Sequence, residues 1–136
     1  MAKRTYIDAN VLIAAFQGDE DTSRRAWIVL DDPERGLVVS DYLRLEVLPK
    51  PMFHRRQEEI EFMQAVLESA AEDVPSSKEL TRQALDLAAR YDMAPMDSLH
   101  VGAAVIARVD ELVTLEKQTR PMLRVKEIKV TSLHSI

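Results

Sequence analysis

The sequence predicts an α/β fold with a central, mostly parallel sheet of about five strands. Short apolar runs of strand type alternate along the chain with longer stretches of helical period. Several of these runs are apolar throughout, which is typical of strands that crossover helices cover on both faces. The 136 residues contain no internal repeat and no linker-like segment, so we expect residues 1–136 to form a single domain.

Five segments are expected to form the strands: residues 5–7, 37–39, 73–74, 112–114 and 128–133. The first is rich in strand-forming residues and ends at Asp8, and the second follows a turn marked by Pro33 and Gly36. Pro75 stops the third strand. Because helical segments separate these strands, we expect them to pair in parallel.

Six segments repeat apolar residues at helical spacing: residues 11–16, 22–30, 41–48, 55–71, 80–91 and 97–106. The third is capped by Ser40 or Asp41 and is expected to end at Pro49. Ser76 and Glu79 form a capping-box pattern ahead of the fifth. The sixth consists largely of small and apolar residues, so we expect it to be fully buried.

The composition excludes several classes of protein. The chain has no cysteine, which rules out disulfides, thiolate metal sites and a cysteine nucleophile. It has 18 Lys and Arg against 23 Asp and Glu, a net charge of −5, so it lacks the positive charge of a basic DNA-binding module. No apolar run approaches the ~18 residues of a membrane span, and the first residues show no signal-peptide pattern. We therefore expect a cytoplasmic protein without a membrane partner.

Four acidic residues occupy positions that a parallel sheet brings to one edge. Sites in such sheets form outside the carboxyl ends of the strands. Asp8 follows the first predicted strand, and Glu116 follows the fourth. Glu46 lies on the helix after the second strand, and Asp97 opens the sixth helix. We therefore expect the four carboxylates to converge.

Converging carboxylates predict a bound cation. Two unit charges ~4 Å apart repel each other by about 4 kcal/mol at an effective dielectric near 20. Such a cluster persists when a divalent ion neutralises it or when some of the carboxylates are protonated. Oxygen ligands without cysteine favour Mg²⁺ or Mn²⁺ over zinc. These ions suit phosphate chemistry because they activate water and neutralise the leaving oxygen.

Each candidate also has a structural interpretation. Asp8 and Asp97 are good helix N-caps, Glu46 is a boundary residue among apolar neighbours, and Glu116 is typical of surface charge. Asp97 and His100 are spaced i, i+3 and could share a metal, but a histidine on a helix flank is more often simply packed.

Four segments, in this order, resemble the motifs of the PIN domain family, which includes the VapC-like ribonuclease toxins of bacterial and archaeal toxin–antitoxin pairs. They are residues 5–13, 40–48, 96–104 and 112–116. The first is a strand followed by an acid, a small residue, Asn and an apolar helix, and the third is an acid that opens a small-residue helix. The resemblance covers nearly the whole chain.

The resemblance implies a three-layer α/β/α fold and Mg²⁺- or Mn²⁺-dependent cleavage of RNA, commonly by homodimers. The main interpretation is an endoribonuclease that hydrolyses RNA phosphodiester bonds, as the toxin of a type II toxin–antitoxin pair with a cognate antitoxin protein. A basic cluster after the fourth motif could track the RNA backbone. It consists of Lys117, Arg120, Arg124, Lys126 and Lys129.

Carried over position by position, the resemblance makes Asp8 and Asp97 the main metal ligands. Glu46 would share the ion directly or through water. Asn10 and Thr114 would orient waters or carboxylates around the ion.

Glu116 departs from the family pattern, because the fourth acid there is usually Asp. The longer side chain can reach a metal through water, but it puts the geometry of any second ion in doubt. A second interpretation therefore stays open, namely a non-catalytic PIN-like module that binds RNA or protein. Receiver domains are disfavoured because they need an acid pair after the first strand, and haloacid-dehalogenase-type phosphatases because they need Asp in place of Asn10.

Overall fold

The computed structural model describes residues 2–134. Within them, five strands form one sheet: β1 (Lys3–Ile7), β2 (Arg35–Ser40), β3 (Glu72–Val74), β4 (Glu111–Thr114) and β5 (Val130–Ser132). Their order across the sheet is β3-β2-β1-β4-β5, and every neighbouring pair is parallel. The predicted α/β fold with a parallel sheet of five strands is therefore confirmed, with β1 at its centre.

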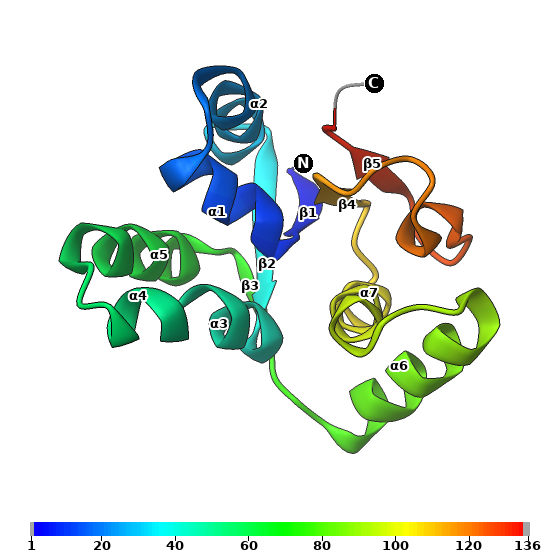
Figure 1. Ribbon diagram of the computed structural model, residues 1–136. Coiled ribbons are helices and arrows are strands. Elements are labelled where there is room, and N and C mark those ends of the chain that lie inside the picture. The colour runs from blue at the N-terminus through cyan, green and yellow to red at the C-terminus, as the bar shows by residue number, and fades with distance from the viewer. Residues whose placement is uncertain (1, 135–136) are drawn as a thin grey trace.

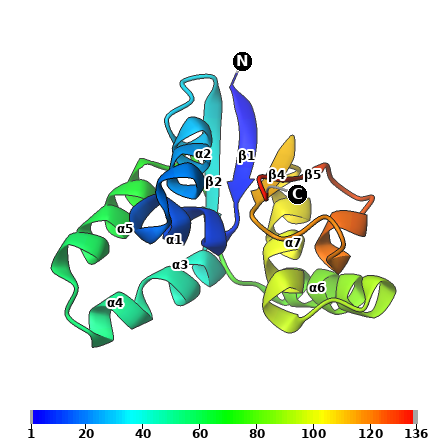
Figure 2. The same cartoon turned by 45° about the horizontal axis from the view of Figure 1, so that its top comes forward.

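Helices cover both faces of this sheet. The described residues form seven α-helices and one 3₁₀ helix: α1 (Ala9–Gln17), α2 (Glu20–Leu30), α3 (Asp41–Val47), α4 (Pro49–Phe53), α5 (Gln57–Ser69), α6 (Lys78–Tyr91), α7 (Pro95–Ala107) and η1 (Pro121–Arg124). α1, α2 and α5 lie on one side of the sheet and α6 and α7 on the other, which gives three layers (Figures 1 and 2). None of the helices in this part of the chain is both long enough and apolar enough to cross a membrane.

Successive residues of each strand face opposite layers. Tyr6 and Leu112 belong to the core shared with α6 and α7, whereas the next residues, Ile7 and Val113, belong to the core shared with α1, α2 and α5. All four side chains are buried. Because both faces of the sheet are covered, the buried parts of β1, β2 and β4 have apolar residues at successive positions instead of alternating ones.

Two helix starts differ from the prediction, each for a local reason. Pro49 begins α4 as well as following α3, because proline in the first helical turn sacrifices no intrahelical hydrogen bond. Ser77, not Ser76, caps α6, since its hydroxyl accepts the backbone N–H of Leu80 at 3.0 Å. The backbone N–H of Ser76 instead donates to the carboxylate of Asp41 at 2.8 Å.

The two helices that flank the predicted site begin differently. Ser40 caps α3 as predicted, because its hydroxyl accepts the backbone N–H of Leu43 at 3.2 Å. α7 begins at Pro95, so Asp97 lies in its first turn instead of at its start. α7 is continuously buried over residues 100–104 but partly exposed at both ends. The expectation that it is fully buried was therefore wrong for both ends of the helix.

The amino ends of the strands carry a buried ion-pair cluster around Glu111. Its carboxylate lies 2.9 Å from Lys3 Nζ and 2.8 Å from Arg35 Nη1, and the Thr131 hydroxyl also donates to it. Burial alone would raise the pKa of Glu111, but hydrogen bonds from Thr131, Arg35 and Lys3 together lower it to about 2. At this edge of the sheet, the negative charge of Glu111 is thus balanced by the positive charges of Lys3 and Arg35.

Candidate metal centre

Asp8 lies at the opposite edge, where the central strand ends. It is 4% exposed, and its side chain both caps α1 and faces the neighbouring strand. Oδ1 accepts the backbone N–H of Ala9 at 2.8 Å, and Oδ2 accepts the hydroxyl of Thr114 at 2.7 Å. Asp8 can therefore both cap α1 and take part in the candidate metal centre.

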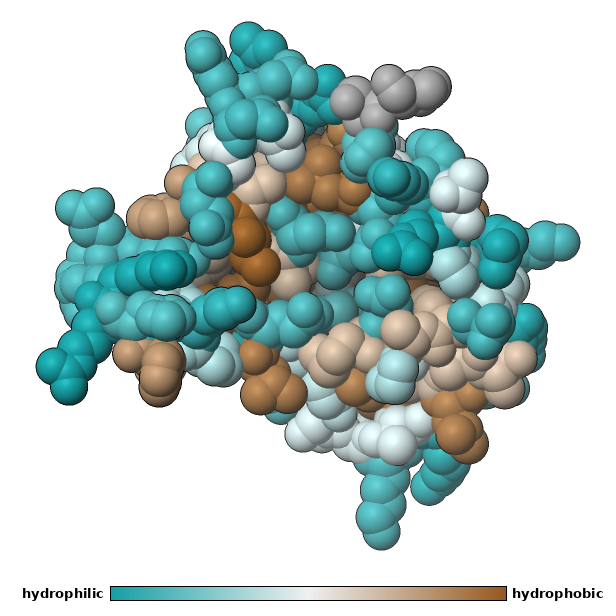
Figure 3. Space-filling model, viewed as in Figure 1, coloured by the Kyte–Doolittle hydropathy of each residue, from teal (hydrophilic) through white to brown (hydrophobic). Residues whose placement is uncertain are grey.

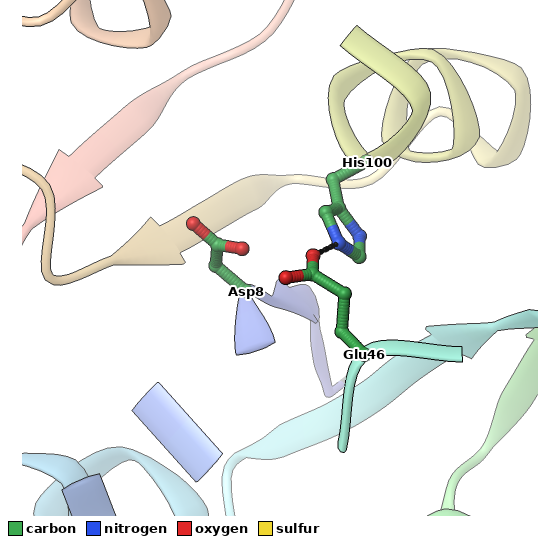
Figure 4. Close-up of side chains that lie close together, drawn as sticks. All are labelled: Asp8, Glu46 and His100. Carbon is green, nitrogen blue, oxygen red and sulfur yellow. Dashed lines mark hydrogen bonds and ion pairs between the residues drawn. The ribbon is translucent and has the colours of Figure 1, made fainter. Parts of the chain in front are cut away.

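Glu46 and His100 approach Asp8 from the two helical layers. Glu46 comes from α3 and His100 from α7, and ligand atoms of the three side chains all lie within 4.8 Å of one another (Figure 4). His100 is fully buried, while the Glu46 side chain is 35% exposed. The imidazole Nε2 of His100 forms a hydrogen bond with Glu46 Oε1. This group of three could hold a metal ion.

Asp97 lies beside this group but is not a member of it. Burial raises the pKa of its carboxyl group to about 6, and the charges of Asp8, Glu116 and Glu46 add to the increase. The other three predicted acids therefore act on Asp97 electrostatically, and Asp8 and Glu46 are the two of the four that belong to the group of possible ligands.

Glu116 is at the border of the site. It lies two residues beyond β4, its side chain is 26% exposed, and its carboxylate is 3.4 Å from the guanidinium of Arg120. Like Asp97, it lies outside the group of three residues with ligand atoms within 4.8 Å.

Asn10 and Thr114 connect Asp8 to the loop after β4. The Asn10 amide donates to the Thr114 hydroxyl oxygen at 3.3 Å, and its carbonyl oxygen accepts the backbone N–H of Leu115 at 3.0 Å. The backbone N–H of Glu116 also donates to the Thr114 hydroxyl oxygen, at 3.1 Å. The two residues thus hold both the Asp8 carboxylate and the backbone that carries Glu116.

Negative charge is in excess at this edge of the sheet. Burial raises the pKa of Asp8, and the charge of Glu46 raises it further, against the opposing hydrogen bonds from Thr114 and Ala9. Hydrophilic residues also fill the middle of this face in the space-filling view, between the two helical layers (Figure 3).

The family model for the PIN domain matches residues 5–124. The chain belongs to the PIN domain family. The match includes all four of the predicted acids and ends with η1.

Three solved structures resemble this PIN domain in fold. A chain from a toxin–antitoxin complex of Klebsiella pneumoniae is 19% identical with a TM-score of 0.72, covering 97% of this chain and 99% of that one. A chain of VapBC2 from Rickettsia felis, bound to a promoter DNA fragment, is 12% identical with a TM-score of 0.71, covering 95% and 98%. A chain of DNA-bound VapBC from Salmonella typhimurium is 13% identical with a TM-score of 0.65, covering 97% and 98%. No curated protein sequence matches significantly. At these identities, the likeness establishes the fold.

The donor set of this PIN domain fits a divalent cation. Asp8 and Glu46 supply carboxylate oxygens at ligand distance, and burial, together with the charges of neighbouring acids, raises the pKa values of Asp8 and Asp97. A cation placed between them would stabilise the ionised forms of both.

Sequence reasoning treated His100 as a packed residue and overlooked its polar contacts. The ring is packed, but Nδ1 lies 2.7 Å from the Tyr6 hydroxyl, which is itself 2.6 Å from Ser40 Oγ. The one pattern in the sequence that pointed to a role for His100 in the site is its i, i+3 spacing from Asp97, which places both residues on one face of a helix. Nothing in the sequence pattern singled out Tyr6, because its aromatic ring suits an ordinary buried strand.

Proposed function

We propose that this PIN domain is an endoribonuclease that uses Mg²⁺ or Mn²⁺ to hydrolyse RNA phosphodiester bonds. The observation that carries the proposal is the meeting of Asp8 with Glu46 beside Asp97, whose pKa burial and the neighbouring acids together raise to about 6. Carboxylate oxygens with an excess of negative charge favour hard cations, which keep several waters and bind phosphate. Family membership supports the same reaction.

Asp8, Glu46 and Asp97 would hold the ion, directly or through water, and Glu116 would contribute from the border of the site. When bound, the ion supplies an activated water and neutralises charge on the phosphodiester. Thr114 fixes the Asp8 carboxylate through its hydroxyl, and Asn10 fixes the loop that carries Glu116. These roles use side chains that converge at the end of the central strand.

The RNA backbone would enter past the loop that follows β4. A cavity of about 480 Å³ lies beside Glu116 and is lined by Lys117, Arg120 and His134, among others. Cationic side chains there suit phosphates adjacent to the one that is cut. Lys129, in contrast, lies 3.8 Å from Glu111 at the amino ends of the strands, so we leave it out of the RNA path.

We propose further that the chain is the toxin of a type II toxin–antitoxin pair. The support is its fold, which resembles chains crystallised in toxin–antitoxin complexes. The expected partners are cytoplasmic RNA, a second copy of the chain and a cognate antitoxin that places an Arg or an amphipathic helix against the acidic edge. Arrest of host growth on induced expression, relieved by co-expression of the adjacent gene, tests this claim.

The test of the reaction is cleavage of a mixed RNA pool with Mn²⁺ and with a chelator. Parent protein is compared with Asp8→Asn and with the control Asp31→Asn, which changes an exposed acid at the end of α2. We expect cleavage only by the parent and the control, and only with metal. RNA binding without metal-dependent cleavage would contradict the proposal and favour the alternative, a non-catalytic PIN-like module.

A further inference from the structure

Four side chains form a continuous hydrogen-bonded chain that ends at the candidate metal centre. Ser40 at the end of β2 contacts Tyr6 of β1, Tyr6 contacts His100 of α7, and His100 contacts Glu46 of α3. Ser40, Tyr6 and His100 are fully buried. We call these four residues the relay.

Counting donors gives the relay a direction. Ser40 Oγ accepts the backbone N–H of Leu43, and the hydroxyl proton of Ser40 then has Tyr6 as its partner. A tyrosine hydroxyl has one proton, which is left to donate to His100 Nδ1. Nδ1 is therefore an acceptor, and the neutral imidazole carries its proton on Nε2, facing the Glu46 carboxylate.

The reverse direction is unfavourable at both ends. If His100 Nδ1 donated to Tyr6, the unprotonated Nε2 would face the carboxylate of Glu46, and two acceptors would be in contact. The buried hydroxyl proton of Ser40 would also lose its acceptor. An unsatisfied buried polar group costs about 1–3 kcal/mol.

We propose that His100 is a positioning residue that holds Glu46 toward the metal by donating its Nε2 proton, and that it is not itself a metal ligand. This rests on the proposed function only in taking Glu46 as a ligand. His100 forms a hydrogen bond with Oε1 of Glu46, and the other carboxylate oxygen of Glu46 points toward Asp8 (Figure 4). The relay thereby fixes the side chain of a ligand that α3 presents partly exposed to solvent.

The relay also restricts the class of metal. Coordination by Nε2 would require its proton to move to Nδ1, which would break the hydrogen bond from Tyr6. With His100 kept as a donor, the ligands are all oxygen atoms, a set that selects Mg²⁺ or Mn²⁺ over zinc. Tyr6 therefore influences metal choice from a position behind the histidine, without contact with the ion.

The first test is the protonation of the His100 ring by long-range ¹H–¹⁵N NMR, without metal and with saturating Mg²⁺. His100→Gln identifies the signal. We expect a proton on Nε2 in both states and a loss of this preference in Tyr6→Phe. A proton on Nδ1 in the metal-free protein, or its departure from Nε2 when Mg²⁺ binds, would overturn the proposal.

The second test is Mn²⁺ affinity by calorimetry, which does not depend on RNA cleavage. We expect His100→Leu to weaken binding about tenfold or more, as loss of a partner behind a ligand does. His100→Gln keeps an N–H donor toward Glu46 and should rescue most of the affinity, and the exposed His54→Gln serves as the control. Equal affinity of His100→Leu and the parent, or equal loss in the Gln and Leu variants, would contradict the positioning role.

The outcomes separate this inference from the proposed function. If Mn²⁺ binding depends on the relay but RNA is not cleaved, the proposed nuclease activity is rejected and the positioning role of His100 is retained. A parent that binds no Mn²⁺ would reject both. Circular dichroism shows whether His100→Leu is folded. If it is unfolded, the Mn²⁺ affinity of His100→Gln and the ring protonation of His100 in Tyr6→Phe still test the positioning role.

Discussion

The hydroxyl of Thr114 donates a 2.7 Å hydrogen bond to the buried carboxylate of Asp8, across 106 positions of sequence. It joins the last residue of β4 to the residue that follows β1, its neighbour in the sheet. The contact lowers the pKa of Asp8 against the larger effect of burial. The hydrogen bond therefore favours the ionised form of Asp8, which is the form that binds a metal.

Thr114→Val should weaken Mn²⁺ binding while Thr114→Ser should retain it. Valine removes the donor but keeps the shape, so the pKa of Asp8 rises further and a proton competes better with the ion. We expect about a tenfold loss of affinity for the valine variant at neutral pH. Equal affinities of the two variants by calorimetry would show that the hydroxyl has no part in the site.

Asp97 should make metal binding and stability depend on pH in opposite directions. Its pKa in the folded protein is about 6, above the ordinary 3.8, so the unfolded chain releases this proton more readily. The stability of the metal-free protein should therefore fall as pH rises from about 4 through 6. Mn²⁺ affinity should rise over the same window, because the ion binds the ionised carboxylate.

Urea unfolding with a chelator, at pH values from 4 to 8, checks this prediction. Asp97→Asn is the comparison, since it removes the titrating group and preserves its size. The variant should show a flatter dependence of the unfolding free energy on pH than the parent. Parallel curves for the two proteins would mean that burial and the neighbouring acids do not raise the pKa of Asp97.

Lys117→Ala should raise the KM for RNA without changing kcat. Lys117 lines the cavity beside Glu116 and follows it in the sequence, but it is not one of the proposed metal ligands. The loss of one phosphate contact should reduce the salt dependence of RNA binding by about one unit of slope. Lys129→Ala is the control, because Lys129 is at the far edge of the sheet with Glu111. An equal effect of the two substitutions would place the RNA elsewhere.

Glu111→Gln should destabilise the fold and leave RNA cleavage unchanged. The pKa of Glu111 is about 2 against an ordinary 4.5, so the carboxylate stabilises the folded state by about 3 kcal/mol above pH 5. This contribution is lost as pH falls from about 4.5 to 2, and the gap between parent and variant in thermal unfolding should close over that range. A gap that stays constant with pH would show that the ion pairs around Glu111 do not set its pKa.

The strands were predictable because burial on both faces leaves a simple pattern in the sequence. Tyr6 and Ile7 are adjacent and face opposite cores, so the segment is apolar throughout. The sequence also placed Asp8 at a strand end and Glu46 on the helix after the next strand, and ligand atoms of these two side chains lie within 4.8 Å of each other. Asp8 and Glu46 come together because of the order of the parallel strands and helices, and the local sequence indicates that order.

Contacts between distant side chains were not predictable in this way. The hydrogen bonds from Tyr6 to His100 and from His100 to Glu46 depend on how α7 is rotated against the sheet and against α3. Capping by Ser77 in place of Ser76 depends on which serine has extended backbone at the start of α6. Such details are decided by packing, for which one sequence provides no periodic signal.

The central claim is that Asp8, Glu46 and Asp97 together bind a hard cation. The direct measurement is the anomalous scattering of a crystal grown or soaked with Mn²⁺. We predict one strong peak bounded by oxygen atoms of Asp8 and Glu46, with Asp97 reaching it directly or through water. A fully occupied Mn²⁺ elsewhere, with these carboxylates free of metal, would contradict the account.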